Sequence, residues 1–236
     1  MNIPILSYHS IGEDTSPISL KTKIFEKQIN FLKKLGYISI NFNEINLNKT
    51  NQIIITFDDG YKDILINALP ILKSSNFKAT CFFVTNHIGK NNQWDKKKDK
   101  FREKNIMSND DIKKWLDSGM SVQSHSHNHV DLTKLSNADI IKELKISKKY
   151  FKDKFNIETD VFCYPFGKVN KNVYDLTKKI YKYAVTTNRS RYNINKHNPL
   201  LIPRVDMGKN ISLTKLYFKL KTIYEDIKFK NHELYL

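Results

Sequence analysis

The chain has 236 residues, a length that suits one large domain or two small ones. Apolar residues make up 40% of the chain and aromatic residues 12%, which is enough for a real core. Two cysteines, Cys81 and Cys163, exclude a disulfide framework and mildly favour a reducing compartment. No apolar run reaches the length of a membrane span.

The net charge of +16 makes nucleic acid, an anionic membrane surface or an acidic polymer physically reasonable partners. The lysines are spread along the chain, however, and no nucleic-acid motif has the required aromatic or helical context, so we expect no nucleic-acid partner. The first nine residues lack a basic segment and a long apolar segment, so they read as a strand and not as a signal peptide. A cytoplasmic location is therefore expected.

Short apolar runs alternate with stretches of helical spacing along the chain. Strands are expected at residues 3–8, 37–40, 52–57, 79–84, 120–123, 159–163, 183–187 and 200–204. Helices are expected at residues 21–35, 63–74 with a kink or break at Pro70, 108–119, from 136 onward, 173–181 and 212–230. Residues 9–17 and 86–105 are predicted to be polar loops.

About seven alternations of strand and helix predict parallel β-α units, and no Gly-, Ser- or Pro-rich linker divides the chain. We therefore predict an α/β fold with one domain over residues 1–236, closed or nearly closed like a barrel. Chemistry in such barrels lies at the carboxyl ends of the strands. The polar residues that fall at those ends are His9, Asp58, Asp59, His125, His129, Tyr164 and Arg204.

Three of these residues form a candidate metal site. His125 and His129 are four residues apart just after a strand, so both imidazoles can face one point. Together with Asp59 they make a three-ligand set with open positions, which is typical of a hydrolytic zinc or related divalent site. The alternative for the histidine-rich segment is a solvated loop, and His127 is predicted to point away.

The remaining groups suit hydrolysis at such a site. Asp58, beside the ligand Asp59, projects differently and can act as the base toward a water molecule. His9 can hold a proton near neutral pH and is the candidate acid, although a structural histidine in a turn is the alternative. The bend at Tyr164 and Pro165 is the candidate source of a backbone N–H, that of Tyr164, for an oxyanion.

Three segments resemble the successive motifs of the polysaccharide deacetylases, the NodB-like family of carbohydrate esterases. They are residues 56–60 (Thr-Phe-Asp-Asp-Gly), His125-Ser126-x-x-His129 and 164–167 (Tyr-Pro-Phe-Gly). Residues 5–11 resemble the opening of the branch that includes the poly-N-acetylglucosamine deacetylases. The resemblance covers residues 3–206 and leaves residues 211–236 as a basic C-terminal helix.

The resemblance implies a distorted (β/α)7-type barrel that hydrolyses N-acetyl groups of amino sugars. It implies a divalent metal, usually Zn²⁺ and sometimes Co²⁺ or Ni²⁺, held by Asp59, His125 and His129. It also implies that Asp58 is the base, and that the Tyr164 amide steadies the oxyanion. In the branch with the N-terminal Tyr-His opening, the resemblance implies that this histidine is the acid, which supports that role for His9.

The sequence departs from the family pattern at two places. The usual C-terminal Leu-x-His has no good match, which leaves the acid to His9. Many relatives have an arginine that orients the base two residues before the motif proline, where this chain has Cys163. Arg204 or Asp206 is the candidate to supply part of that role.

The sequence thus predicts a metal-dependent N-deacetylase of an acetylated amino-sugar glycan: surface polysaccharide, peptidoglycan-type or lipid-linked. A barrel that binds glycans without cleaving them and a hydrolase of small non-sugar amides are the alternatives. The basic C-terminal helix would suit peripheral contact with an anionic membrane at its inner face, or it is a solvated face packed on the barrel. The oligomeric state is left open.

Overall fold

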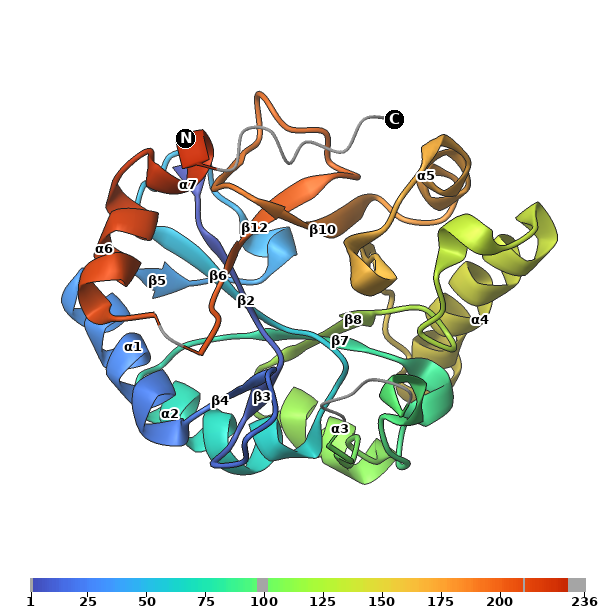
Figure 1. Cartoon of the computed structure of the whole chain (residues 1–236), viewed down its shortest axis with the longest axis horizontal. Coiled ribbons are helices and arrows are strands. Elements are labelled where there is room, and N and C mark those ends of the chain that lie inside the picture. The colour runs from blue at the N-terminus through green and yellow to red at the C-terminus, as the bar shows by residue number, and fades with distance from the viewer. Residues whose placement is uncertain (1, 97–101, 210, 229–236) are drawn as a thin grey trace.

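The computed structural model describes residues 2–96, 102–209 and 211–228. Seven parallel strands form a closed ring, because the first of them pairs with both the last strand and the second (Figure 1). In ring order the strands are β2 (Ile5–Tyr8), β6 (Gln52–Phe57), β7 (Thr80–Phe83), β8 (Ser121–Ser124), β9 (Val161–Cys163), β10 (Tyr183–Arg189) and β12 (Ile202–Asp206). The predicted α/β barrel is confirmed.

Strand β6 shows why the ring forms from this sequence. All six of its residues are buried, and its β-branched and aromatic side chains suit a strand covered on both faces. Ile54 contributes to a cluster that includes Phe82 and Ile202, and its neighbours Ile53 and Ile55 pack in a separate cluster with the helices. Alternating residues of one strand therefore fill the two sides of the ring.

Helices surround the barrel on its outside (Figure 1). They are α1 (Thr22–Lys34), α2 (Leu69–Ser74), α3 (Asn109–Asp117), α4 (Asn137–Phe155), α5 (Lys171–Lys178), α6 (Leu213–Lys221) and α7 (Tyr224–Lys228). Ser108 and Ser136 cap α3 and α4 as their sequence patterns predict, since each side chain accepts a hydrogen bond from the third residue of its helix. Short 3-10 turns lie at Phe42–Glu44, Thr85–His87, Gln93–Asp95, Leu132–Lys134 and Pro165–Gly167.

Two expected helices are divided. Residues Ile64–Ala68 form a π-helix, and α2 starts at Leu69, because Pro70 lacks an N–H and is tolerated only in a first turn. The expected helix over 212–230 is broken at Thr222, whose backbone is extended, into α6 and α7; residues 229 and 230 lie outside the described residues.

Several short strands were not predicted. β3 (Ser10–Ile11), in the expected loop at residues 9–17, pairs with β4 (Ser19–Leu20) just after that loop, and β1 (Asn2–Ile3) pairs with β11 (Tyr192–Asn193). The strand expected at residues 37–40 is present as β5 (Ile38–Ser39), which joins the first residues of β6 outside the ring. Among the residues that the structure describes, no helix has both the length and the apolar character needed to cross a bilayer.

Candidate active site

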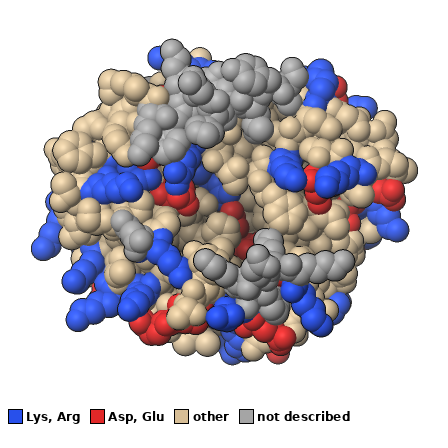
Figure 2. All heavy atoms as spheres, viewed as in Figure 1, with Lys and Arg blue, Asp and Glu red and all other residues tan. Residues whose placement is uncertain are grey.

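The polar residues flagged at the strand ends meet at one end of the barrel. His9 follows β2, Asp58 and Asp59 follow β6, and His125 follows β8. Figure 2 shows a hollow at the centre of this face with acidic side chains at its bottom. Parallel strands bring their carboxyl ends to the same rim, so residues far apart in sequence become neighbours.

Asp59, His125 and His129 form a compact, buried cluster. The Oδ1 atom of Asp59 lies 3.4 Å from Nε2 of His125 and 3.4 Å from Nε2 of His129. That oxygen is buried and receives no hydrogen bond from the residues that the structure describes. Burial would raise the pKa of Asp59, yet the interactions with His125 and His129 hold it well below its usual range. The cluster is therefore an ionised carboxylate facing two imidazole nitrogens.

The backbone at this cluster is held in uncommon conformations. Asp59 and His129 have φ values of 74° and 55°, in the left-handed region that non-glycine residues rarely adopt. Gly60 follows with φ 80°, and a Cβ atom there would collide with the ring of Phe83. This close approach explains why glycine follows the acid pair, and the sharp turn directs the two carboxylates differently.

A second layer of contacts fixes the two histidines. Nδ1 of His125 lies 2.8 Å from the carbonyl oxygen of Cys163. When Nδ1 carries the proton and donates it to this oxygen, Nε2 keeps its lone pair and can bind a metal ion. The ring of His129 contacts the rings of Trp94 and Phe166, whose centroids are 4.9 Å and 4.6 Å away. The donor set, its orientation and the buried oxygen without a hydrogen bond all fit a divalent cation of the zinc type.

Asp58 is held by Arg204. The guanidinium donates to both carboxylate oxygens, NH1 to Oδ1 and NH2 to Oδ2, each at 2.7 Å. Both side chains are buried, with exposed fractions of 2% for Arg204 and 5% for Asp58. Burial would raise the pKa of Asp58, but the charge and hydrogen bonds of Arg204 outweigh it and lower the pKa. Asp58 is therefore ionised and fixed in orientation.

His9 is a second neighbour of the Asp58 carboxylate. Its Nε2 atom is 3.9 Å from Oδ2 of Asp58, and its side chain is 36% exposed. The imidazole is thus at the boundary between the buried acid pair and solvent. This is a suitable place for a group that exchanges protons with a bound molecule.

A sequence profile described as polysaccharide deacetylase matches residues 46–185. The chain belongs to the polysaccharide deacetylase family. The matched segment contains Asp58, Asp59, His125 and His129, whereas His9 and Arg204 lie outside it. The closed barrel brings both of these residues next to Asp58, which lies in one of the family motifs.

Individual relatives agree with this membership. A putative polysaccharide deacetylase of Bacillus subtilis, YxkH, is 31% identical over 193 residues, which cover 78% of this chain and 64% of that protein. The poly-beta-1,6-N-acetyl-D-glucosamine N-deacetylase of Staphylococcus aureus is 28% identical over 214 residues, covering 84% of this chain and 71% of that protein. The chain thus spans slightly less than two thirds of the Bacillus protein.

A solved structure of the family is also similar. The Streptococcus pyogenes deacetylase PplD, in complex with acetate, matches with a TM-score of 0.82 at 26% identity. The match covers 94% of this chain and 99% of that one.

Two expectations for this site are corrected by the geometry. Asp206 pairs with Arg189, and among the described residues it is Arg204 that contacts the carboxylate of Asp58, so Asp206 does not orient the base. The N–H of Tyr164 donates to the carbonyl oxygen of Val185 at 3.2 Å, because the ladder between β9 and β10 continues through this residue. This N–H is therefore engaged in the sheet and is not directed at an oxyanion, while the adjacent Pro165 has no N–H to offer.

The sequence did not point to two further residues at this site. Trp94 and Phe166 contact His129, but neither was assigned a role. Trp94 is one of only two tryptophans and stands in a polar loop, which was a usable signal. Phe166 has φ 59° and is 41% exposed, so the strained motif turn presents its ring beside the metal cluster. His127 lies apart from the cluster, as predicted, with Nδ1 3.0 Å from Oγ1 of Thr85.

Proposed function

We propose that this chain is a metal-dependent hydrolase that removes N-acetyl groups from a glycan containing amino sugars. The proposal rests on one observation: two buried sets of side chains lie next to each other at the barrel rim. One is the cluster of Asp59, His125 and His129, and the other is Asp58 held by Arg204. Family membership and the named activities of the relatives support the same chemistry.

The metal cluster would hold Zn²⁺ through Oδ1 of Asp59 and Nε2 of His125 and His129, with Co²⁺ or Ni²⁺ as substitutes. When bound, the cation supplies Lewis-acid polarisation to the acyl group and to the attacking water. Cys163 contributes through its carbonyl oxygen, which fixes the tautomer of His125. Trp94 and Phe166 both contact the ring of His129 and restrict its movement.

Asp58 would act as the base. Its carboxylate takes the proton from the attacking water while the guanidinium of Arg204 keeps it from rotating. Arg204 is in this way the replacement for the family arginine that Cys163 displaces; the thiol lies 3.5 Å from NH2 of the same guanidinium. His9 would donate a proton to the leaving nitrogen, which departs as the free amine of the sugar.

The substrate side of the site would bind an acetylated amino sugar. Phe166 offers a partly exposed ring next to the metal cluster, suited to the apolar face of a pyranose. The Staphylococcus relative acts, by its name, on poly-β-1,6-N-acetyl-D-glucosamine, and the Streptococcus structure contains acetate, the product of deacetylation. A surface polysaccharide, a peptidoglycan-type glycan and a lipid-linked sugar all present the same N-acetyl group.

Acetate release tests this function. The purified chain is assayed on free, polymeric and lipid-linked acetylated amino sugars, after chelation and after adding back Zn²⁺ or Co²⁺. We expect activity only with metal, and a loss of about 10²–10⁴-fold in Asp58→Asn and His125→Ala with far-UV circular dichroism unchanged. Full turnover in the chelated enzyme would exclude the mechanism. Binding of metal and glycan without acetate release would indicate a barrel that binds glycans and does not cleave them. Release of acetate from non-sugar amides alone would indicate a hydrolase of small amides.

A second surface, separate from the barrel rim, concerns the location at which the protein would encounter its substrate. Helices α6 and α7 expose a row of apolar side chains, namely Leu213, Tyr217, Phe218, Ile223 and Ile227. Exposed lysines, including Lys215 and Lys221, accompany them on α6, and the upper left of Figure 2 shows a broad uncharged area over these helices. We infer peripheral contact of this face with an anionic membrane, since apolar insertion and lysine attraction act together there.

A further inference from the structure

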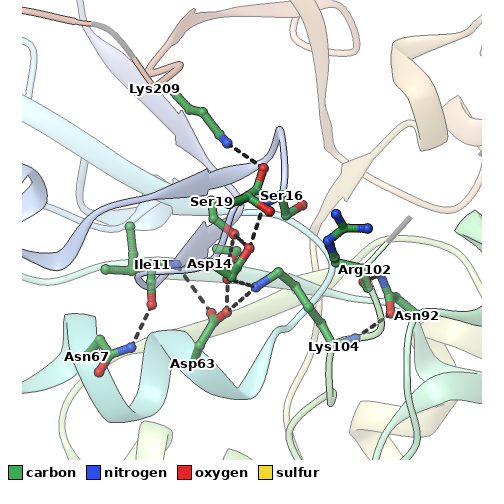
Figure 3. A network of polar contacts seen from close by, with 12 residues as sticks. Ile11, Asp14, Ser16, Ser19, Asp63, Asn67, Asn92, Arg102, Lys104 and Lys209 are labelled. Atoms are coloured by element: carbon green, nitrogen blue, oxygen red, sulfur yellow. Dashed lines mark hydrogen bonds and ion pairs between the residues drawn. The ribbon is translucent and has the colours of Figure 1, made fainter. Parts of the chain in front are cut away.

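A network of polar contacts lies outside the metal cluster and holds the segment that carries His9 (Figure 3). This segment, residues 9–20, is called the His9 loop below. Ser10 donates its hydroxyl hydrogen to Oδ2 of Asp63 at 2.6 Å, and the N–H of Ile11 donates to Oδ1 of Asp63 at 3.3 Å. Asp63 therefore binds the two residues that follow His9 through both of its carboxylate oxygens.

Lys104 connects this carboxylate to a third segment. Its ammonium donates to Oδ2 of Asp63 at 3.0 Å and to Oδ2 of Asp14 at 2.6 Å, and its side chain is only 9% exposed. A nearly buried ammonium is strongly held by two carboxylates, because few water molecules can replace the contacts that it makes with them. Lys104 thus joins the loop formed by residues 86–96 and 102–105 to the His9 loop.

The same loop reaches the metal cluster at its other end. The N–H of Lys104 donates to Oδ1 of Asn92 at 2.7 Å, and Asn92 is buried. Trp94, two residues further, packs on the ring of His129. One cation therefore ties together the loop over the metal cluster and the loop that carries His9.

The position of Asp63 in the chain links this network to Asp58 and to the metal cluster. It lies four residues after Asp59 and five after Asp58, beyond the tight turn at Gly60. The segment that supplies the base and a metal ligand thus also supplies the anchor of the His9 loop. The imidazole of His9 lies 3.9 Å from Asp58, beyond hydrogen-bonding distance, and its charge also acts on Asp59, so its placement depends strongly on the backbone that follows it.

We propose that Asp63, together with Lys104, is a positioning residue that fixes His9 relative to Asp58. Anchoring at Ser10 and Ile11 prevents the partly exposed imidazole from moving away from the acid pair. The assignment rests on the proposed function, because it gives the network a role through the proton donor of deacetylation. Displacing such a group by about 1 Å lowers a rate by up to about 10²-fold.

The chain provides a matched control for this carboxylate. Asp226 also accepts hydrogen bonds from a serine hydroxyl, a backbone N–H and a cation: Ser190 Oγ at 3.0 Å, Arg191 N at 3.1 Å and Arg191 NH2 at 2.6 Å. It anchors α7 and makes no described contact with the His9 loop. Asp226→Asn therefore reproduces the loss of the same kind of anchor at another place.

The first measurement does not depend on activity. Hydrogen–deuterium exchange is followed for peptides covering residues 9–20 in the wild type and in Asp63→Asn, Lys104→Met and Asp226→Asn. We expect at least about tenfold faster exchange of the Ile11 amide in the first two variants, and wild-type exchange there in the third. Ser10→Ala, which removes a single donor, serves if Asp63→Asn does not fold. Unchanged exchange at Ile11 in the folded variants would overturn the proposal.

The second measurement tests the consequence for His9. We expect kcat for acetate release to fall about 10–100-fold in Asp63→Asn, with KM within about twofold of wild type. In a His9→Ala background the same substitution should add almost nothing, since its effect is transmitted through His9. Asp226→Asn should retain wild-type kcat. An additive loss in the double variant, or wild-type kcat in Asp63→Asn, would overturn the positioning role.

The two failures are distinguishable. A wild-type chain that releases no acetate contradicts the proposed function, and the exchange experiment still decides whether Asp63 restrains the His9 loop. An active wild-type chain with additive variants contradicts the positioning role alone.

Discussion

At the scale of single residues, the site depends on a buried charge pair that crosses the barrel. Arg204 in β12 reaches Asp58 at the end of β6, although β2 lies between these strands. A buried pair adds little net stability by itself, but removing one partner is costly because the other charge stays in a poorly solvated place. Stability and activity therefore respond differently to each half of the pair.

Substitution of Arg204 separates these two effects. We expect Arg204→Met to lower the free energy of unfolding by about 3–5 kcal/mol, since Asp58 loses its cation. Adding Asp58→Asn should recover most of that stability and none of the activity. Chemical denaturation and acetate release measure the two quantities. A single Arg204→Met variant as stable as wild type would contradict the argument, and Arg204→Lys, which keeps the charge without the paired geometry, is the control.

The sequence led to most of this site and missed the rest for identifiable reasons. Acids after a buried strand and histidines four apart are local signals, so Asp58, Asp59, His125 and His129 could be found without coordinates. Arg204 and Asp206 could not be separated, because residues two apart share a strand face. Their positions along β12 separate them in the structure. The side chain of Arg204 is buried inside the ring, and that of Asp206 lies at the exposed edge of the ring.

At the scale of elements, the C-terminal helices are fastened by charges. Asp226 in α7 binds Arg191, which follows β10, and Glu225 binds Lys219 of α6 in a buried pair. The ammonium of Lys219 also donates to the carbonyl oxygen of Asp206 at 3.0 Å, at the end of β12. The expected continuous basic helix is instead two short helices with one face tied to the barrel, while the opposite face stays exposed.

The anchor of α7 predicts a pH dependence of stability. Burial raises the pKa of Asp226, but the hydrogen bonds and charge of Arg191 outweigh it and lower the pKa. A lowered carboxyl pKa stabilises the fold above the unfolded value of about 3.9, and this contribution is lost as pH falls through the folded value. The difference in unfolding free energy between wild type and Asp226→Asn should therefore narrow below about pH 4. Urea denaturation from pH 7 to pH 3 measures it, and a constant difference would contradict the assignment.

The loops around the site were the least predictable elements. β3 and β4 are only two residues long, too short for an alternating pattern to be recognised. Their pairing depends on contacts from distant segments, above all Asp63 and Lys104. The break near Pro70 was predictable because its cause, a missing N–H, is local.

At the scale of the whole molecule, a net charge of +16 combines with the apolar face of α6 and α7. We expect the protein to sediment with anionic vesicles at low salt and not with neutral ones. Tyr217→Ser with Phe218→Ser should reduce sedimentation several-fold without affecting acetate release from a soluble substrate. These substitutions are preferable to truncation, because Leu216 and Leu220 on the same helix are buried. Absence of binding at low salt would exclude the membrane contact.

The closure of the barrel has a consequence for the order in which the site forms. Strand β12 inserts between β10 and β2, and it is the last strand of the described residues. Asp58, Asp59, His125 and His129 all precede it in the chain, but Asp58 has no guanidinium beside it until residues 202–206 have taken their place in the ring. Because the carboxylate and the guanidinium meet only across β2, the charge pair forms together with ring closure and not before it.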